Sequence, residues 1–184
     1  MGDKVVQKNI LLTGPPGCGK STIIEKIVQG INVPCTGFFT REMRERGRRV
    51  GFSIATMDGR RGIMAHIDIR SRYRVGKYGV NLQDIDTIAV PSMVAESDNV
   101  VVVVDEIGKM ECFSEMFRQT LLRVLDSPNT VVGSIALKGD AFIKAIKKRP
   151  DSRLIPVLEK NRDVLAEEVL CWSRGSDLSP LHFK

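Results

Sequence analysis

The segment GPPGCGKS at residues 14–21 constrains the fold of this chain more than any other feature. It matches the spacing GxxxxGK[ST], follows the apolar run Ile10-Leu11-Leu12, and precedes residues 19–29, whose apolar positions have helical spacing. Glycines let the backbone adopt positive φ, so successive N–H groups can line a nest for anions at the helix N-terminus. The segment therefore predicts a strand–loop–helix unit that binds phosphate groups.

Two side chains of this loop have specific predicted roles. Lys20 is expected to contact the β- and γ-phosphates of a nucleotide, and the Ser21 hydroxyl is expected to bind Mg²⁺. The residues predicted to surround the phosphates are Gly14, Pro15, Pro16, Gly17, Cys18, Gly19, Lys20, Ser21 and Thr22.

A second motif begins with the apolar run Val100–Val104, which suits a central parallel strand covered on both faces. Asp105 follows it directly, and an acid after such a strand is predicted to hold Mg²⁺ with the Ser21 hydroxyl. Glu106 is predicted to orient or deprotonate an attacking water. Ile107 and Gly108 are expected to border the nucleotide.

The rest of the chain predicts an α/β domain. Residues 36–67 contain apolar residues at period 2 and an Asp58-Gly59 turn, which predict an antiparallel meander of about three strands. Further strands are expected at 130–137 and 154–158, a basic loop at 70–81, and helices at 82–97 (with a break near Pro91), 113–125 and 163–172. We expect one domain over residues 1–184, with a polar tail at 173–184. Its predicted core is a mostly parallel open sheet with helices on both faces.

Positive charge is concentrated in one stretch. The net charge is +6, and residues 41–77 alone hold eleven basic residues against four acidic ones. Such a patch attracts phosphate, on a small molecule or on nucleic acid, unless it is a solvated hairpin surface. Within it, Arg70, Arg72, Arg74 and Lys77 form a basic loop. Arg74 is predicted to stabilise the transition state of phosphoryl transfer, and the alternative is a mobile surface loop.

Three other residues have open interpretations. Asn161 and Arg162 follow the last predicted strand, where ligands of open α/β sheets bind, so they are predicted to contact the base. The alternative is that Asn161 caps the next helix. Glu111 is either a further acid of the site or an ordinary acid in a first helical turn.

Composition narrows the class of protein. No apolar run approaches the ~20 residues that span a bilayer, and no signal peptide is visible. The four cysteines form no CxxC pair, and there are only two histidines, so no Cys/His metal site is expected. These features predict a cytoplasmic protein with free thiols.

The motifs together resemble the THEP1-type nucleoside-triphosphatases, which include the cancer-related NTPase. The resemblance rests on GPPGCGKST at 14–22, DEIGKME at 105–111, GFFTREMRERGRRVGFSI at 37–54, RVGKYGV at 74–80 and NRDVL at 161–165. It implies a RecA-like P-loop NTPase fold. It also implies slow, Mg²⁺-dependent hydrolysis of ATP, GTP, CTP and UTP to NDP and phosphate, with broad choice of base.

Two alternatives remain open. The same parts would make a small-molecule or nucleotide kinase if an acceptor displaced the water. A nucleotide-gated RNA- or DNA-binding module is also possible, although aromatic residues are only 5% and no RRM, KH or helix-turn-helix pattern is present. No membrane contact is expected, and a monomer is favoured.

Overall fold

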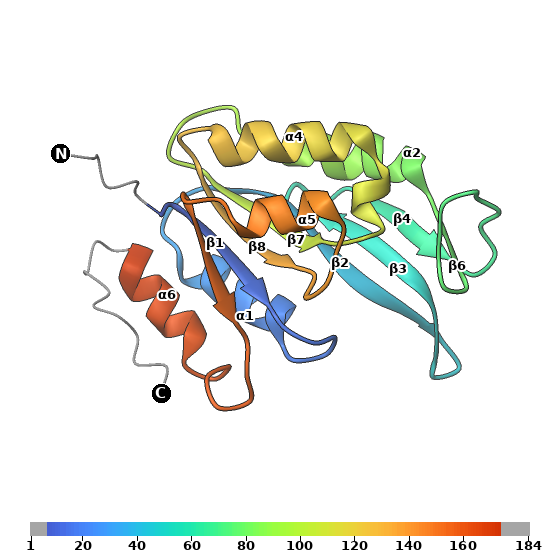
Figure 1. Ribbon diagram of the computed structural model, residues 1–184, viewed down its shortest axis with the longest axis horizontal. Helices are drawn as coiled ribbons and strands as arrows, with labels where there is room; N and C mark the ends of the chain where they lie inside the picture. The colour runs from blue at the N-terminus through green and yellow to red at the C-terminus, as the bar shows by residue number, and fades with distance from the viewer. Residues whose placement is uncertain (1–6, 174–184) are drawn as a thin grey trace.

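A computed structural model describes residues 7–173 of the chain. Within this range, a sheet of nine strands has the order β5-β6-β4-β3-β2-β7-β8-β1-β9 (Figure 1). Five neighbouring strands are parallel: β2 (Cys35–Glu45), β7 (Val101–Ile107), β8 (Thr130–Ile135), β1 (Asn9–Thr13) and β9 (Ser152–Pro156). The predicted, mostly parallel open sheet is confirmed.

The predicted meander extends this same sheet. Antiparallel pairing continues from β2 into β3 (Arg48–Thr56), β4 (Arg61–His66), β6 (Tyr78–Val80) and β5 (Arg74–Val75). The long β2 strand therefore belongs to both halves, parallel to β7 on one side and antiparallel to β3 on the other. As a result, the meander stands beside the carboxyl end of the parallel strands.

Helices cover both faces of the sheet, as predicted (Figure 1). α1 (Lys20–Gly30) and α6 (Leu165–Ser173) lie on one face, and α4 (Glu115–Asp126) and α5 (Ala141–Lys147) lie on the other. A hydrophobic core lies on each face of the sheet, and the side chains of β1 point alternately into the two. Ile10 and Leu12 pack with α1 and α6, whereas Leu11 belongs to the core under α4 and α5. Within the described part of the chain, no helix is long and apolar enough to cross a bilayer.

Two predicted elements differ from the structure. The expected loop at 70–81 contains the β5–β6 hairpin, because Tyr78 and Val80 are buried in the core. The helix expected at 82–97 is confirmed over residues 82–92, where α2 (Leu82–Asp84), a π-helical segment η1 (Ile85–Ala89) and α3 (Val90–Ser92) follow one another, and it ends earlier than expected. It ends just after Pro91, whose ring removes a backbone donor. Most of the predicted polar tail at 173–184 lies outside the described residues.

The order of the central strands sets the position of both motifs. β8 lies between β1, which leads into GPPGCGKS, and β7, which leads into Asp105-Glu106. All three strands are parallel, so their carboxyl ends meet at one edge of the sheet. Ser134 on β8 therefore lies between the two motifs, and it is fully buried.

Candidate active site

The segment at residues 14–21 forms the predicted turn between β1 and α1. Gly17 has φ of 76° and Gly19 has φ of 100°, and Gly19 is the N-cap of α1. Residues other than glycine rarely adopt this left-handed backbone conformation. The buried Lys20 side chain folds over the loop, and its Nζ donates to the carbonyl oxygens of Gly14 (3.1 Å) and Pro15 (3.2 Å). The loop thus holds an ammonium group at the helix N-terminus, as the motif predicts.

Asp105 is a buried carboxylate at the end of β7. Its Oδ1 accepts a hydrogen bond from the Ser134 hydroxyl (2.6 Å), and its Oδ2 has no partner among the described residues. Burial raises the pKa of Asp105, while the hydroxyls of Ser134 and Ser21 and the charges of Arg41 and Lys20 act in the opposite direction. A buried, unpartnered carboxylate oxygen is costly, so this geometry favours a ligand for that atom.

The chemistry of these donors fits Mg²⁺. Mg²⁺ prefers oxygen ligands and is usually bound by one or two protein groups together with substrate phosphates. The free Asp105 oxygen and the nearby Ser21 hydroxyl are such a pair. No group of three or more His, Cys, Asp or Glu suited to a metal occurs in the described residues. The site thus fits a cation that is shared with a substrate rather than fully enclosed by protein.

Glu106 faces the open cleft beside the phosphate loop. The cleft has a volume of about 760 Å³, and Glu106 lines it together with Lys20 and Ser21. Burial raises the pKa of Glu106, the Lys20 charge lowers it, and the Asp105 charge raises it further. The structure therefore brings the first and second motifs together around one cavity.

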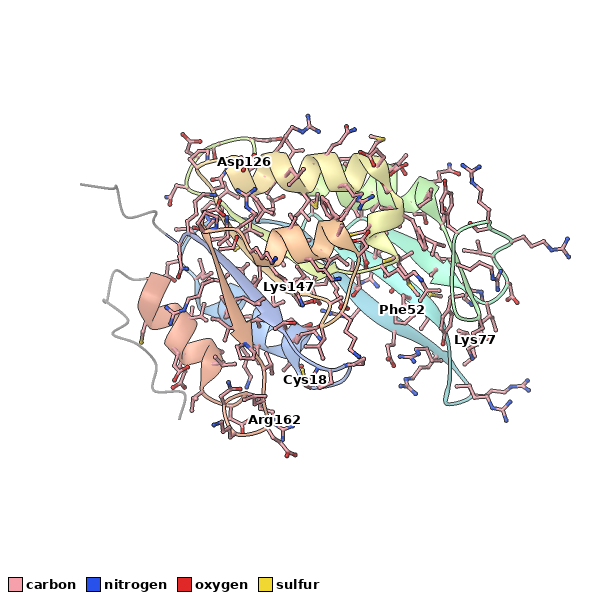
Figure 2. The ribbon with its side chains drawn as sticks, in the orientation of Figure 1. Cys18, Phe52, Lys77, Asp126, Lys147 and Arg162 are labelled. Atoms are coloured by element: carbon pink, nitrogen blue, oxygen red, sulfur yellow. The ribbon has the colours of Figure 1, made fainter. Side chains whose placement is uncertain are left out.

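The far wall of the cleft comes from the meander. Its residues are Thr40, Arg41 and Glu42 of β2, Arg49 and Phe52 of β3, and Val75, Gly76 and Tyr78 of the β5–β6 hairpin. Figure 2 shows Phe52 on the meander side of the loop residue Cys18. The sequence interpretation missed Arg41, Arg49, Phe52, Tyr78 and Ser134. For Ser134 a signal existed, since a hydroxyl lies next to the carboxyl end of the parallel strand β8 (Thr130–Ile135).

Arg74 lies at the edge of this wall. Its guanidinium donates to the Lys77 carbonyl oxygen (2.7 Å), across the turn of its own hairpin. The neighbours Val75 and Gly76 line the cleft, whereas Arg74, Arg72 and Lys77 are exposed and are not part of the lining. Its role in catalysis stays a prediction.

Three other predicted nucleotide contacts have other partners. The Asn161 side chain closes the β9–α6 loop: it accepts from Leu158 N (2.8 Å) and donates to the Pro156 carbonyl oxygen (2.9 Å). Arg162 is exposed beside Asp163, with Nε 3.8 Å from Oδ1. The Ile107 side chain is buried in the core. Their contacts to a nucleotide stay predictions.

Glu111 is buried under the second motif. A Cβ added to Gly108 would lie 2.9 Å from Glu111 Oε2 and 3.6 Å from the Glu106 carboxyl carbon, so the glycine leaves room for both acids. The Glu111 carboxylate accepts from its own backbone N–H and from that of Gly108. Burial raises the pKa of Glu111 to about 8, and the Glu106 charge adds to this. Glu111 is therefore a buried acid that supports the turn, and it does not line the cleft.

This buried acid predicts a pH-dependent stability. In the unfolded chain Glu111 titrates near ~4.3. Between that value and about 8 the folded protein retains a proton that the unfolded chain has lost, so stability falls as pH rises. Glu111→Gln should remove this slope, by up to ~1.4 kcal/mol per pH unit. Thermal unfolding at pH 5–8 should show that the Tm of the variant rises relative to the Tm of the wild type as the pH increases. Glu115→Gln, at an exposed glutamate, is the control, and parallel curves for both variants would contradict the assignment.

Cys18 offers a chemical probe of the phosphate loop. The thiol is partly exposed, Cys171 is exposed, and Cys112 is buried with its pKa raised by burial to about 12. We expect Mg·ADP to slow the alkylation of Cys18 several-fold and to leave the rate at Cys171 unchanged. Peptide-mapped alkylation with and without Mg·ADP measures both rates in one sample. Equal Cys18 rates in the two samples would count against the loop as the nucleotide site.

Comparisons with known proteins agree with this geometry. The family model described as NTPase matches residues 9–170. The chain is 45% identical to the nucleoside-triphosphatase THEP1 of Thermotoga sp. (strain RQ2), over 88% of this chain and 92% of that protein. It is 35% identical to the human cancer-related nucleoside-triphosphatase, over 92% of this chain and 98% of that protein.

Solved structures give the same answer for the fold. The crystal structure of THEP1 from Aquifex aeolicus superposes with a TM-score of 0.82 at 37% identity, over 89% of this chain and 98% of that one. The solution structure of the human protein gives 0.78 at 34% identity, over 92% and 98%. These matches confirm the predicted RecA-like P-loop fold. By sequence and by structure, the chain belongs to the THEP1-type family of nucleoside-triphosphatases.

Proposed function

We propose that this protein hydrolyses nucleoside triphosphates to NDP and phosphate in an Mg²⁺-dependent reaction. One observation carries the proposal: Lys20, Ser21 and Glu106 line the same cleft, and Asp105 adjoins it with an unpartnered oxygen. The names of the relatives point to the same activity.

The protein groups divide the work between binding and catalysis. Backbone N–H groups around Gly17 and Gly19 hold the phosphates, and Lys20 exchanges the two loop carbonyls for phosphate oxygens. Ser21 and Asp105 would hold Mg²⁺, which offsets negative charge on the β- and γ-phosphates when bound. Glu106 orients the attacking water and accepts its proton, and burial makes this carboxylate a stronger base than an exposed one.

We also propose a broad choice of base. Bases of nucleotides bound to such sheets are expected beyond the carboxyl ends of the strands, at the β9–α6 loop. There, the Asn161 amide already makes hydrogen bonds inside the loop, and Arg162 is an exposed, donor-only group. Because the Asn161 amide is engaged in this way, it is less able to read the edge of one base, so we expect weak discrimination among adenine, guanine, cytosine and uracil.

Arg74 remains our proposed transition-state cation. Its hairpin already lines the cleft through Val75 and Gly76, and its exposed side chain would release the Lys77 carbonyl oxygen to reach a phosphate. Arg74→Ala should lower kcat by ~10-fold or more, with a smaller effect on KM. The matched control is Arg72→Ala, because Arg72 is exposed and rests on the Tyr73 ring. Steady-state phosphate release measures both, and equal kcat for the two variants would reject Arg74.

The alternative of nucleic-acid binding is weakened by local pairing of charge. Four arginines of the basic stretch already pair with acids in the structure: Arg41 with Glu25, Arg44 and Arg49 with Glu42, and Arg60 with Asp58. Oligonucleotide binding that weakens steeply as salt rises would support that alternative instead.

Product analysis tests the main proposal. The wild-type protein is incubated with Mg²⁺ and each of ATP, GTP, CTP and UTP, and NDP and phosphate are quantified. We expect equal amounts of both products, with rates for the four substrates within about tenfold. Absence of phosphate release with all four would overturn the proposal, and omission of Mg²⁺ is the matching control.

A further inference from the structure

The cleft extends well beyond the phosphate loop. Its volume is about 760 Å³, within the ~300–1,000 Å³ that holds small-molecule ligands, and its lining continues from Lys20 and Ser21 to β3 and the β5–β6 hairpin. No residue of the β9–α6 loop, where we expect the base of the NTP, is part of its lining. In Figure 2, Arg162 of that loop and Phe52 lie on opposite sides of Cys18. Neither the phosphates nor the base of the NTP is therefore expected to occupy the meander side of the cleft.

The wall on that side is a built surface. Arg49 lies over two rings, with its guanidinium carbon 5.3 Å from the Phe52 centroid and 6.0 Å from the Tyr78 centroid. The two rings meet edge to face at 5.3 Å. Arg49 Nε is 3.2 Å from the Tyr78 hydroxyl, and its Nη1 donates to Glu42 (2.5 Å). A flat guanidinium held between aromatic rings and a carboxylate offers a stacking face, donors and an acceptor in one place.

The charge of this wall selects the kind of ligand. Arg49 is paired with Glu42, which it shares with Arg44, and Arg41 is paired with Glu25, so each cation that lines this wall has a carboxylate beside it. A strongly anionic ligand would meet two carboxylates as well as two guanidiniums. A neutral ring with donors and acceptors on its edge would instead find a complementary partner for each.

We infer that the Arg49–Phe52–Tyr78 wall binds a nucleoside as a second substrate. A hydroxyl group of this nucleoside faces the γ-phosphate of the NTP and accepts the γ-phosphoryl group. The inference rests on the proposed binding of NTP by the phosphate loop. It adds a second substrate to that site, so water and the nucleoside compete for the same phosphoryl group.

The transfer balances without any further reactant. The nucleoside hydroxyl oxygen bonds to the γ-phosphorus while the bond from that phosphorus to the β–γ bridging oxygen breaks. NDP leaves with the electron pair, and the hydroxyl proton passes to the Glu106 carboxylate. The products are NDP and a nucleoside monophosphate.

Labelled product analysis tests the inference directly. Wild-type protein, Mg²⁺ and ATP labelled at the γ-phosphate are incubated with adenosine, guanosine, cytidine or uridine, and in separate samples with the four monophosphates. We expect a labelled nucleoside monophosphate from at least one nucleoside, formed at the expense of labelled phosphate. Labelled phosphate as the only product with every nucleoside, or labelled diphosphate from the monophosphates alone, overturns it.

Substitutions locate the subsite. Arg49→Gln and Phe52→Leu should each lower the ratio of nucleoside phosphorylation to hydrolysis at least tenfold. Arg48→Gln is the matched control, because Arg48 is the exposed neighbour on β3 and is not among the residues that line the cleft. The ratio remains informative if a variant loses overall activity, and thermal unfolding reports on its folding. Equal ratios for Arg48→Gln and Arg49→Gln overturn the placement of the site.

The two proposals fail separately. Phosphate release without any nucleoside tests hydrolysis alone. If that release occurs and no nucleoside is phosphorylated, hydrolysis stands and the acceptor subsite is rejected. If nucleosides are phosphorylated but no phosphate is released in their absence, the subsite stands and hydrolysis is rejected.

Discussion

Lys20→Ala should lower the rate of NTP hydrolysis by at least ~10²-fold, the usual cost of removing one preorganised group that stabilises transition-state charge. Lys20 is the only cationic side chain within the phosphate loop, and it is held against the loop by the carbonyls of Gly14 and Pro15. Its charge also acts on both acids of the second motif, lowering the pKa of Asp105 and of Glu106. Phosphate release under single-turnover conditions measures the effect.

Lys26→Ala is the matched control for this experiment. Lys26 lies on the same helix, α1, but is exposed and does not line the cleft. It should keep wild-type turnover. The Lys20 variant should also unfold at a slightly lower temperature, because two hydrogen bonds worth ~1 kcal/mol each in net terms are lost. Near-normal turnover by the Lys20 variant would reject the site.

The parts of the site that lie within one short segment were predictable from the sequence. GxxxxGK[ST] between an apolar strand and an amphipathic helix leaves few conformations, and the structure has glycines at positive φ where the motif requires them. The valine run before Asp105 likewise predicted a buried parallel strand, and β7 is one. Local sequence was sufficient because each motif is a contiguous unit with its own backbone requirements.

The far wall of the cleft was not predictable in the same way. Arg49, Phe52 and Tyr78 come from two strands that are about 30 positions apart, and they meet only because the meander folds back through β4 to β6. Arg49 was visible only as one of eleven basic residues. Its side chain is distinguished from that of Arg48 by which face of β3 it occupies, and this depends on the strand register.

For the basic segment at 70–77, the sequence interpretation gave weight to the charged residues and overlooked the buried ones. Its charges attracted attention, yet the buried residues Tyr78 and Val80 decide its structure by forming the β5–β6 hairpin. Net charge of a segment indicates what it attracts, and it does not indicate which guanidinium lies over a site. The second motif poses the same problem, because the sequence alone does not show which of two glutamates, Glu106 or Glu111, reaches the site.

Glu106→Gln should retain nucleotide affinity and lose turnover, by ~10²-fold or more in kcat. The amide keeps the shape and the hydrogen-bonding capacity of the side chain but cannot accept a proton from water. Glu106 lines the cleft beside Lys20, whereas Glu111 is 4% exposed and is bound to the backbone N–H of Gly108. Only the first of these carboxylates has access to a water near the γ-phosphate.

Glu111→Gln is the matched control, since it makes the same chemical change five positions further along the chain. Mg·ATP binding and single-turnover hydrolysis should be measured on both variants. We expect Glu106→Gln to bind within a few-fold of the wild type without turning over, and Glu111→Gln to keep turnover. Because a buried Glu111 already holds a proton near neutral pH, its amide replaces a neutral group by a neutral group. The reverse pattern, with hydrolysis surviving in the first variant and lost in the second, would transfer the role of general base to Glu111.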